Sequence, residues 1–373
     1  MGSSPSQDHA PPKAQLRYAI IGCGAGVAAL HLEALSKLQN IEVVAMCDID
    51  LERGQKRAIT GDCPFFLDHE VLLRERRPDV AVICTPHPDH PRLAKDCLRA
   101  GAHVLVEKPL AVDVADADEM IATAERAGRL LGVSFQERFR PATEYARAFM
   151  QSGRLGPVIR VLSSEPWLRT AAYYRSASWR GTWKGEGGGV LLNQASHTLD
   201  LLCHLTGMPA TVWGMTRTRV HAMECEDSAQ AMLEYENGGF GYLTASTVEG
   251  GTEKRIEVVG DRALLKIADE QLSIVNFDPP LRDHIAAAPH RSHPRTRKHP
   301  IELAPAAAQG HLAVHEDFQA AILEGRAPRC DGREALMSLE LANAIVLSSF
   351  TERPVKLPLD RRAYTQLLDR LRC

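Results

Sequence analysis

The sequence predicts an α/β protein with two parts, a doubly wound parallel sheet followed by an α+β layer. Three observations carry this prediction. Up to about residue 135, short apolar runs alternate with helical stretches; a glycine-rich turn follows the first run; and beyond Arg140 the pattern changes to hairpins. Apolar runs that lack polar alternation are typical of parallel strands buried on both faces. The length of 373 residues suits two domains.

The first part contains five expected strands, at 16–22, 43–47, 80–84, 103–106 and 131–134. The expected helices are 30–38, 51–60, 69–76, 90–100 and 114–127. Strands and helices alternate at this spacing when each helix crosses over one face of a parallel sheet. We therefore expect helices on both faces of this sheet.

The second part begins with a helix that Pro141 opens at its first turn and that ends near residue 152. Polar and apolar residues alternate over 230–235, 240–246 and 255–258, with a turn at 237–239. This alternation is typical of antiparallel strands with one exposed face. Further helices are expected at 312–324, 333–350 and 361–371. The basic segment 282–299 can bind an anion, but such runs are more often solvated loops, and we expect a loop.

Charge and cysteine content exclude several classes of protein. Lysine and arginine total 44 and aspartate and glutamate 47, a balance that argues against a partner such as nucleic acid or an anionic membrane. The nine cysteines form no C-x-x-C pair, so neither disulfides nor a metal site is predicted. Residues 1–15 have no apolar segment and are interpreted as a disordered tail without a secretory signal, which indicates a cytoplasmic protein.

The turn after the first strand carries glycines at three alternate positions, Gly22, Gly24 and Gly26. Glycines in this place let the backbone approach a pyrophosphate, which the next helix attracts with its free N–H groups. We expect Ala25 and Val27 to line the same site, although Val27 replaces the third glycine of the usual fingerprint. The alternative is a plain turn between strand and helix.

Asp48 follows the second strand, twenty-two residues after Gly26. An acidic residue at this distance accepts hydrogen bonds from the ribose hydroxyls of NAD and repels the 2′-phosphate of NADP. The alternative is that Asp48 only caps the helix that begins near Leu51. Arg53 weakens the exclusion of NADP, so NAD is the expected cofactor and NADP the alternative.

Three longer motifs are more specific. From Cys84 the chain runs C-T-P-H-P-D-H-P-R-L-A-K-D-C-L-R-A-G-A-H-V-L-V-E-K-P-L, from Gly187 G-G-G-V-L-L-N-Q-A-S-H-T-L-D-L-L, and from His315 H-E-D-F-Q-A-A-I-L-E-G-R-A-P. In these motifs the chain resembles the Gfo/Idh/MocA oxidoreductases, which include inositol and glucose dehydrogenases. The resemblance implies a Rossmann dinucleotide-binding domain at 16–137. It also implies a C-terminal domain at 138–373 with an open, mostly antiparallel sheet, whose helices pack back on the first domain.

The resemblance places Lys108 at the family's catalytic lysine and His197 at its catalytic histidine, and it implies a cis bond between Lys108 and Pro109. It also implies four residues around the dinucleotide: Thr85, Pro86, His90 and Glu107. Gln136 and Arg138, after the last parallel strand, are expected to line the cleft. A histidine of ordinary pKa can accept an alcohol proton, and a buried lysine can stabilise charge on the oxygen. The alternative for His197 is a helix residue bonded within the core.

Substrate-binding residues are expected beside this pair. Asn193 stands four residues before His197, where many relatives have an aspartate, and on one helix the two residues share a face. Trp179, Arg180 and Trp183 precede the three glycines. Aromatic rings pack on the apolar faces of sugars, and an arginine binds hydroxyl or phosphate groups. The alternative is an aromatic corner of the core.

These expectations predict an NAD(P)-dependent dehydrogenase or reductase that interconverts a ring secondary alcohol and a ketone. The substrate would be a sugar, polyol, glycoside or nucleotide sugar. A second enzymatic hypothesis keeps NAD tightly bound and recycles it within one active site, for sugar–sugar oxidoreduction or glycoside transformation through a 3-keto intermediate. A third is a non-catalytic dinucleotide-binding protein, which only Asn193 favours. The resemblance further implies a homodimer or homotetramer.

Overall fold

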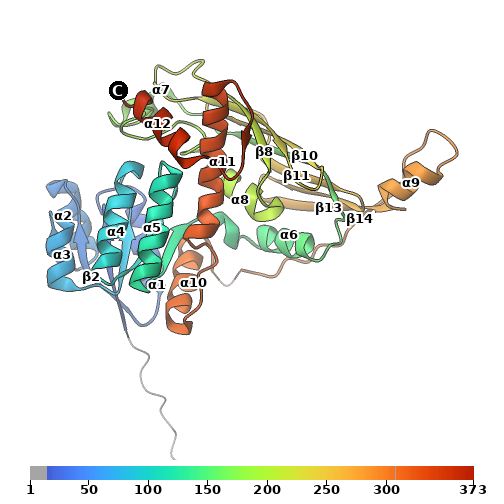
Figure 1. Ribbon diagram of the computed structural model, residues 1–373. Coiled ribbons are helices and arrows are strands. Elements are labelled where there is room, and N and C mark those ends of the chain that lie inside the picture. The colour runs from blue at the N-terminus through green and yellow to red at the C-terminus, as the bar shows by residue number, and fades with distance from the viewer. Residues whose placement is uncertain (1–14, 307) are drawn as a thin grey trace, which may run out of the picture.

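The computed structural model describes residues 15–306 and 308–373, and the chain forms two sheets (Figure 1). The interpreted tail therefore lies outside the described residues, apart from Gln15. The first sheet is parallel, with the order β3 (Phe65–Phe66), β2 (Ile41–Cys47), β1 (Leu16–Ile21), β4 (Val80–Ile83), β5 (His103–Glu107) and β6 (Leu131–Ser134). The direction of the strand order reverses between β1 and β4. At such a switch point, parallel sheets bind ligands beyond the carboxyl ends of their strands.

Helices cover both faces of this sheet, because every strand presents apolar side chains on each side. The helices that follow its strands are α1 (Ala28–Lys37), α2 (Leu51–Thr60), α3 (His69–Arg76), α4 (His90–Arg99) and α5 (Val114–Ala127), and the short 3-10 helices are η1 (His87–Asp89) and η2 (Gln136–Phe139). Tyr18 and Ile20 of β1 pack in one apolar cluster with residues of α1, whereas Ala19 and Ile21 pack in another with residues of α3, α4 and α5.

The second sheet has nine strands in the order β14-β13-β12-β11-β7-β10-β9-β8-β15. Only β7 and β10 pair in parallel; the other neighbours are antiparallel. The strand bounds are β7 (Val158–Pro166), β8 (Thr211–Arg217), β9 (Ser228–Glu234), β10 (Phe240–Ser246), β11 (Arg255–Gly260), β12 (Ala263–Ala268), β13 (Gln271–Asp278), β14 (Arg295–Lys298) and β15 (Val355–Lys356). The alternation expected from the sequence is present: in β9 every second residue is buried.

Seven helices of the described chain follow η2: α6 (Pro141–Gln151), α7 (Ala171–Arg175), α8 (Ser196–Thr206), α9 (Leu281–Ala287), α10 (Gly310–Glu324), α11 (Gly332–Thr351) and α12 (Arg361–Leu371). The last three return to the first sheet, since α10 contacts α1 while α11 and α12 contact α5. Figure 1 shows α11 between the two sheets. A backbone bridge between Gly132 and Asp331 adds the returning chain to the edge strand β6.

Most expected elements of the first part are present, and α2, α3 and α5 begin and end at the expected residues. The two-residue strand β3 is an addition. The capping alternative for Asp48 is wrong, because Asp50 caps α2 by accepting a hydrogen bond from Arg53 N. The segment 282–299 is exposed, as expected, but is not only a loop: it contains most of α9 and the edge strand β14.

All nine cysteines are free thiols. Cys23, Cys47 and Cys84 are buried near the carboxyl ends of β1, β2 and β4, and burial raises the pKa of each thiol. Buried thiols of raised pKa are unreactive and pack as small apolar groups. Among the residues that the structure describes, no helix combines the length and apolar character needed to cross a bilayer.

Candidate active site

The glycine-rich turn lies between β1 and α1, at the switch point of the parallel sheet. Gly22 has a φ of +83°, and a Cβ there would lie 2.8 Å from the backbone nitrogen of Thr85. At Gly26 a Cβ would meet nothing within 4 Å. Val27 precedes the helix and makes no side-chain capping hydrogen bond, and the first turn carries no acidic residue. Backbone, open space and an uncapped helix terminus together suit a phosphate group.

Asp48 lies opposite this turn, at the carboxyl end of β2. Its Oδ2 accepts a hydrogen bond from Gly24 N at 2.7 Å, and its Oδ1 accepts one from Asp50 N at 2.9 Å. A Cβ on Gly24 would lie 2.9 Å from Oδ2, so a larger residue there would push the carboxylate away from the turn. Each carboxylate oxygen keeps a further lone pair that can accept a bond from a ligand hydroxyl.

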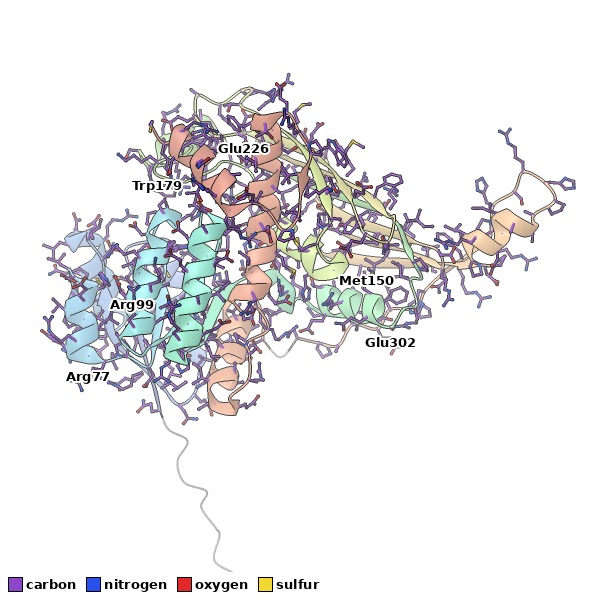
Figure 2. The ribbon with its side chains drawn as sticks, in the orientation of Figure 1. Arg77, Arg99, Met150, Trp179, Glu226 and Glu302 are labelled. Atoms are coloured by element: carbon purple, nitrogen blue, oxygen red, sulfur yellow. The ribbon has the colours of Figure 1, made fainter. Side chains whose placement is uncertain are left out.

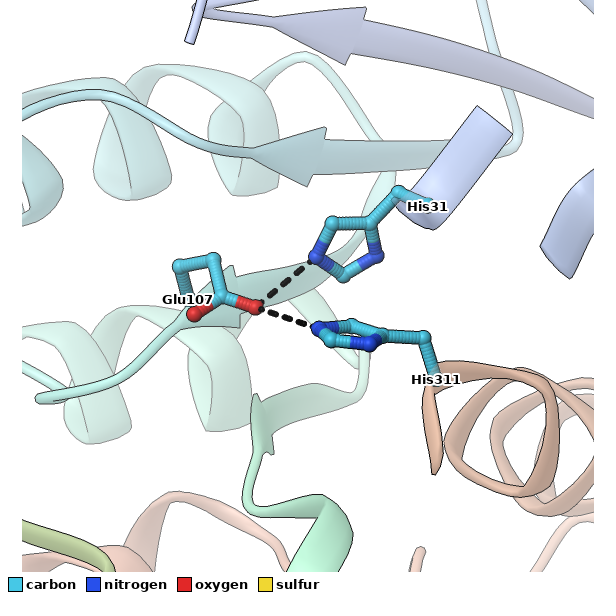
Figure 3. A group of neighbouring side chains, drawn as sticks. All are labelled: His31, Glu107 and His311. Carbon is cyan, nitrogen blue, oxygen red and sulfur yellow. Dashed lines mark hydrogen bonds and ion pairs between the residues drawn. The ribbon is translucent and has the colours of Figure 1, made fainter. Parts of the chain in front are cut away.

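The segment that carries Lys108 is braced by two buried side chains. His90 faces the carbonyl oxygens of Thr85 and Pro109 with its two ring nitrogens, each at 2.9 Å. Glu107 directs Oε1 to His31 and His311 (Figure 3), while its Oε2 accepts a bond from Lys108 N at 3.3 Å. We expected both side chains beside a dinucleotide. In the structure both side chains contact the protein and brace the segment that carries Lys108, and their position beside a dinucleotide stays a prediction.

Lys108 is half-buried, and its Nζ donates a hydrogen bond to the carbonyl oxygen of Asn193 at 3.0 Å. Burial lowers the pKa of this ammonium, while the nearby carboxylates of Glu107 and Glu186 raise it and offset part of that effect. The Lys108–Pro109 bond is cis, as expected. Lys108 is therefore held by one backbone carbonyl and keeps donors free for another oxygen.

His197 lies in the first turn of α8 and is 6% exposed. Its ring packs edge-on against Phe135, with 5.6 Å between the centroids. Burial, and then the charge of Lys108, lower the pKa of His197 to about 3. The imidazole is therefore neutral at neutral pH, which corrects the ordinary pKa that we expected. Its Nδ1 is buried and has no hydrogen-bond partner among the described residues.

Asn193 is not on α8, which begins at Ser196, so the helical spacing to His197 that we expected is wrong. It lies in the preceding turn, where Asn193 N bonds to Gly189 O at 3.1 Å. Its side-chain amide donates to the hydroxyl of Tyr173 at 3.0 Å and to the carboxylate of Glu186.

An aromatic and cationic cluster continues from Tyr173. Arg180 donates to the Tyr173 hydroxyl at 2.6 Å, and its guanidinium carbon lies 4.2 Å from the ring centre of Tyr173 and 4.5 Å from that of Trp179. The ring of Trp179, labelled in Figure 2, lies 6.5 Å from that of His87 on the first sheet's side. Trp183 is different: it is 6% exposed and packs against Phe350. The core alternative therefore holds for Trp183.

Gln136 and Arg138, which follow β6, lie in different surroundings. Gln136 carries a buried Oε1 without a partner in the described chain, as does the Oγ1 of Thr85. Arg138, which we expected in the cleft, is instead buried in a two-pronged ion pair with Asp200. Native proteins pair most of their buried polar atoms. The unpaired atoms of Thr85, Gln136 and His197 therefore suit a polar ligand.

Sequence profiles agree with this arrangement. Residues 16–135 match the profile of the oxidoreductase family described as an NAD-binding Rossmann fold, and residues 147–357 match that of its C-terminal alpha/beta domain. The chain belongs to the Gfo/Idh/MocA oxidoreductase family. It is therefore an NAD-binding oxidoreductase, as the resemblance implied.

Characterised members of the family include dehydrogenases of sugars. D-glucoside 3-dehydrogenase of Escherichia coli (strain K12) is 29% identical over 278 residues, 66% of this chain and 76% of that protein. D-apiose dehydrogenase of Paraburkholderia graminis is 27% identical over 363 residues, 92% of this chain and 90% of that protein. The WlbA dehydrogenase from Bordetella pertussis, solved in complex with NADH and UDP-GlcNAcA, superposes with a TM-score of 0.81 at 28% identity, covering 93% of this chain and 99% of that one.

NAD fits the residues of this chain. The open space at Gly26 and the uncapped start of α1 suit its pyrophosphate, and Asp48 suits the adenosine ribose. The sequence alone missed Glu186 and Arg169. Glu186 anchors Asn193, and Arg169 lies over the rings of Trp167 and Tyr173. No local motif marks them, because both act through contacts between loops.

Proposed function

We propose that this protein is a dehydrogenase or reductase that uses NAD to interconvert a ring secondary alcohol and a ketone. The observation that carries the proposal is the pairing of Lys108 with His197. Burial, and then the ammonium of Lys108, lower the pKa of the imidazole, and both side chains keep capacity for further hydrogen bonds. Oxidising an alcohol requires such a pair, since its hydroxyl proton must leave as charge develops on the oxygen.

Each residue has one role in this mechanism. Nicotinamide, when bound, accepts or supplies the hydride. Lys108 Nζ, fixed by the Asn193 carbonyl, donates a hydrogen bond to the substrate oxygen and stabilises the charge that develops there. His197 is neutral and accepts the hydroxyl proton at a ring nitrogen, with Nδ1 the unpartnered one. The charge of Glu137, buried nearby, raises the pKa of His197 and so favours the protonated ring.

We propose a carbohydrate or polyol, in free, glycosidic or nucleotide-linked form, as the substrate. Arg180 and Asn193 both donate hydrogen bonds to the Tyr173 hydroxyl, and the half-exposed ring of Trp179 packs against the Arg180 guanidinium. An apolar ring beside charge-bearing donors suits a sugar, whose faces are apolar and whose edges carry hydroxyls. The named activities of the E. coli and Paraburkholderia relatives support the same class.

We propose residues 16–137 as the dinucleotide-binding domain and 138–373 as the substrate-binding and oligomerisation domain. We further propose that the exposed face of the second sheet pairs with a second copy. Five large apolar side chains lie on three neighbouring strands of that face: Trp213, Met215, Met232, Phe240 and Tyr242. Trp213 and Tyr242 both lie directly opposite Met232, so the apolar side chains form one surface. A continuous apolar surface of this kind is typical of an interface.

A panel of polyols, free sugars, glycosides and nucleotide sugars tests the function, with NADH absorbance as the measurement. We expect turnover within one of these classes, and Lys108→Ala is expected to lower it at least ~100-fold because a positioned charge is lost. Lys37→Ala is the matched control, since Lys37 lies on the surface, where it pairs with Glu33. Unchanged turnover in Lys108→Ala would contradict the catalytic role.

The panel also separates the proposal from its alternative. Cofactor that stays bound through dialysis, together with products formed without added NAD, would indicate recycling of the cofactor within one site. Absence of turnover with every class, in a protein that binds NADH, would favour the non-catalytic hypothesis.

A further inference from the structure

Three side chains that could not be grouped from the sequence meet behind the catalytic lysine. His31 lies on α1, Glu107 ends β5 next to Lys108, and His311 lies in the first turn of α10. Figure 3 shows both imidazoles directed at the same carboxylate oxygen. The distance from Glu107 Oε1 to His31 Nε2 is 2.8 Å, and to His311 Nε2 it is 3.4 Å.

We propose that His31, Glu107 and His311 bind one divalent transition-metal ion, and that zinc is the ion that this site suits best. Each residue offers one ligand atom, and the three atoms lie within 4.8 Å of one another. Ligand atoms of a tetrahedral zinc ion are separated by about 3.3 Å, given bonds of about 2.0–2.1 Å. The distance from His311 Nε2 to Glu107 Oε1 already matches this separation. The distance from His31 Nε2 to the same oxygen would have to increase by about half an ångström.

The donor set favours a transition metal over calcium or magnesium. Two imidazole nitrogens and one carboxylate oxygen are ligands that zinc accepts, whereas magnesium and calcium prefer oxygen throughout. In this chain Oε2 of Glu107 is bonded to Lys108 N, which leaves Oε1 as the single metal-facing oxygen. The side chains of His311 and Glu107 are 12% and 10% exposed, so water can reach the fourth position and an ion can enter.

A second layer of side chains supports the first. Nδ1 of His31 lies 2.9 Å from Nε2 of His315, a buried residue one turn further along α10. A metal at His31 Nε2 replaces the proton there, and the ring then carries its proton on Nδ1, where His315 accepts a hydrogen bond. His315 also has a buried Nδ1 without a hydrogen-bond partner in the described chain, so the polar atoms of this cluster are not all satisfied by the protein.

The ion would have a structural role. Its three ligands come from the first sheet, from the helix after the glycine-rich turn and from the helix that returns at the end of the chain. Metal binding would therefore fasten α10 to the segment that positions Lys108. This structural role is distinct from the proposed oxidoreductase reaction, in which Lys108 and His197 contact the substrate hydroxyl.

One other group could compete for the metal. His69, Glu70 and Asp96 also bring three ligand atoms together, on α3 and α4. Glu70 is exposed, and Asp96 already lies within ion-pair distance of Arg92 and Arg99. These arginines oppose a cation, so we expect this group to bind zinc weakly and to serve as the control.

The test uses the full chain after treatment with a chelator, titrated with Zn²⁺ by calorimetry and with Co²⁺ by visible absorption. We expect one ion per chain and the intense visible bands of four-coordinate Co²⁺. His311→Ala is expected to weaken zinc binding more than ~10-fold. Removing a hydrogen-bond partner of a metal ligand already lowers metal affinity by at least that factor, and removing a ligand itself should lower it at least as much. His69→Ala should leave the affinity unchanged. Circular dichroism in chelator checks that His311→Ala keeps its fold.

X-ray absorption at the zinc edge of the wild-type protein tests the ligands without any substitution. Two imidazoles and light-atom neighbours at about 2.0–2.2 Å are expected. Sulfur neighbours, a stoichiometry near zero, or equal affinity of wild type and His311→Ala would overturn the proposal. Loss of the site in His69→Ala with retention in His311→Ala would assign the metal to the other group.

Discussion

Asp48 uses both of its carboxylate oxygens on backbone N–H groups, yet its charge remains beside the expected ribose position. We expect the wild-type protein to bind NADH more tightly than NADPH. Asp48→Ala is expected to reduce the ratio of the two affinities about tenfold or more, because repulsion of the 2′-phosphate is lost. Affinities of both cofactors, measured by fluorescence titration, check this.

Asp48→Asn is the sharper variant. An amide oxygen still accepts the bond from Gly24 N, so the turn keeps its acceptor while the charge is lost. The ratio of NADH to NADPH affinity should be reduced in Asp48→Asn as it is in Asp48→Ala. Tighter binding of NADPH than NADH by the wild-type protein would contradict the role of Asp48.

Within the three-glycine motif, Gly189 packs directly against the backbone of Glu226. A Cβ on Gly189 would lie 1.9 Å from the carbonyl oxygen of Glu226. The carboxylate of Glu226 accepts hydrogen bonds from Gly189 N at 3.0 Å and Leu191 N at 3.1 Å. The turn that carries Asn193 is thus packed against Glu226, which precedes β9, and there is no room for a side chain at Gly189.

Between elements, the ion pair of Arg138 with Asp200 fastens η2 to α8, and both side chains are 1% exposed. Asp200→Ala is expected to lower the free energy of unfolding by up to about 3–5 kcal/mol, because the buried guanidinium then keeps only Glu334 and the Arg329 carbonyl as partners among the described residues. Urea denaturation measures the change.

Glu125→Ala is the matched control, since Glu125 pairs with Arg333 on the surface and such pairs contribute about 0–1 kcal/mol. Replacing both buried partners, as in Arg138→Met with Asp200→Leu, should recover much of the loss. A loss no larger than that of Glu125→Ala would show that the buried pair contributes little.

At this scale the sequence predicts most of the fold. Buried strands and amphipathic helices leave periodic patterns, so β4, α2 and α5 follow directly from them. The strand β3 has two residues, too few for a pattern, and it exists because its neighbour β2 offers an open edge.

The candidate site is less predictable. Its motifs indicate Lys108 and His197, but the partners of each side chain come from other loops. Asn193 looks helical when only its spacing is considered, and the structure places it in a turn held by Glu186. Contacts between distant segments, such as Glu107 with His311, depend on the tertiary fold and leave no local pattern.

Across the whole molecule, the apolar sheet face predicts a dimer or larger assembly. Met232→Lys places a charge at its centre and should raise the monomer fraction, because burying an unpaired ammonium is costly. Light scattering after size exclusion measures the mass. Lys266→Ala is a control on a strand of the same sheet, where Lys266 pairs with Glu253. A monomeric wild type at micromolar concentration would contradict the proposed pairing.

Stability should also depend on pH. The pKa values of four buried histidines are lowered by burial, namely those of His87, His90, His197 and His315. The lowered pKa values favour proton uptake by these rings on unfolding, so their contribution to stability is present above about pH 6.5 and is lost as pH falls below it. Glu226 acts in the opposite sense, because burial raises its pKa to about 7 and the folded state takes up the proton first.

The free energy of unfolding is therefore expected to fall as the pH is lowered from 7 to 5, because the unfolded chain takes up protons on these histidines. Urea denaturation at pH 7, 6 and 5 measures this slope. Glu226→Gln should make the slope steeper by removing the opposing group, and a flat profile from pH 7 to 5 would contradict the prediction.

The bridge between Gly132 and Asp331 has a consequence for how the chain is made. Val133 N donates to Cys330 O at 3.0 Å, and α10 covers the face of the first sheet where Phe318 and Val314 pack with Tyr18 and Ile20. A ribosome delivers β1 to β6 long before these residues. The half that is synthesised first is therefore completed last, and the part of its apolar face that α10 covers stays exposed until translation has almost ended.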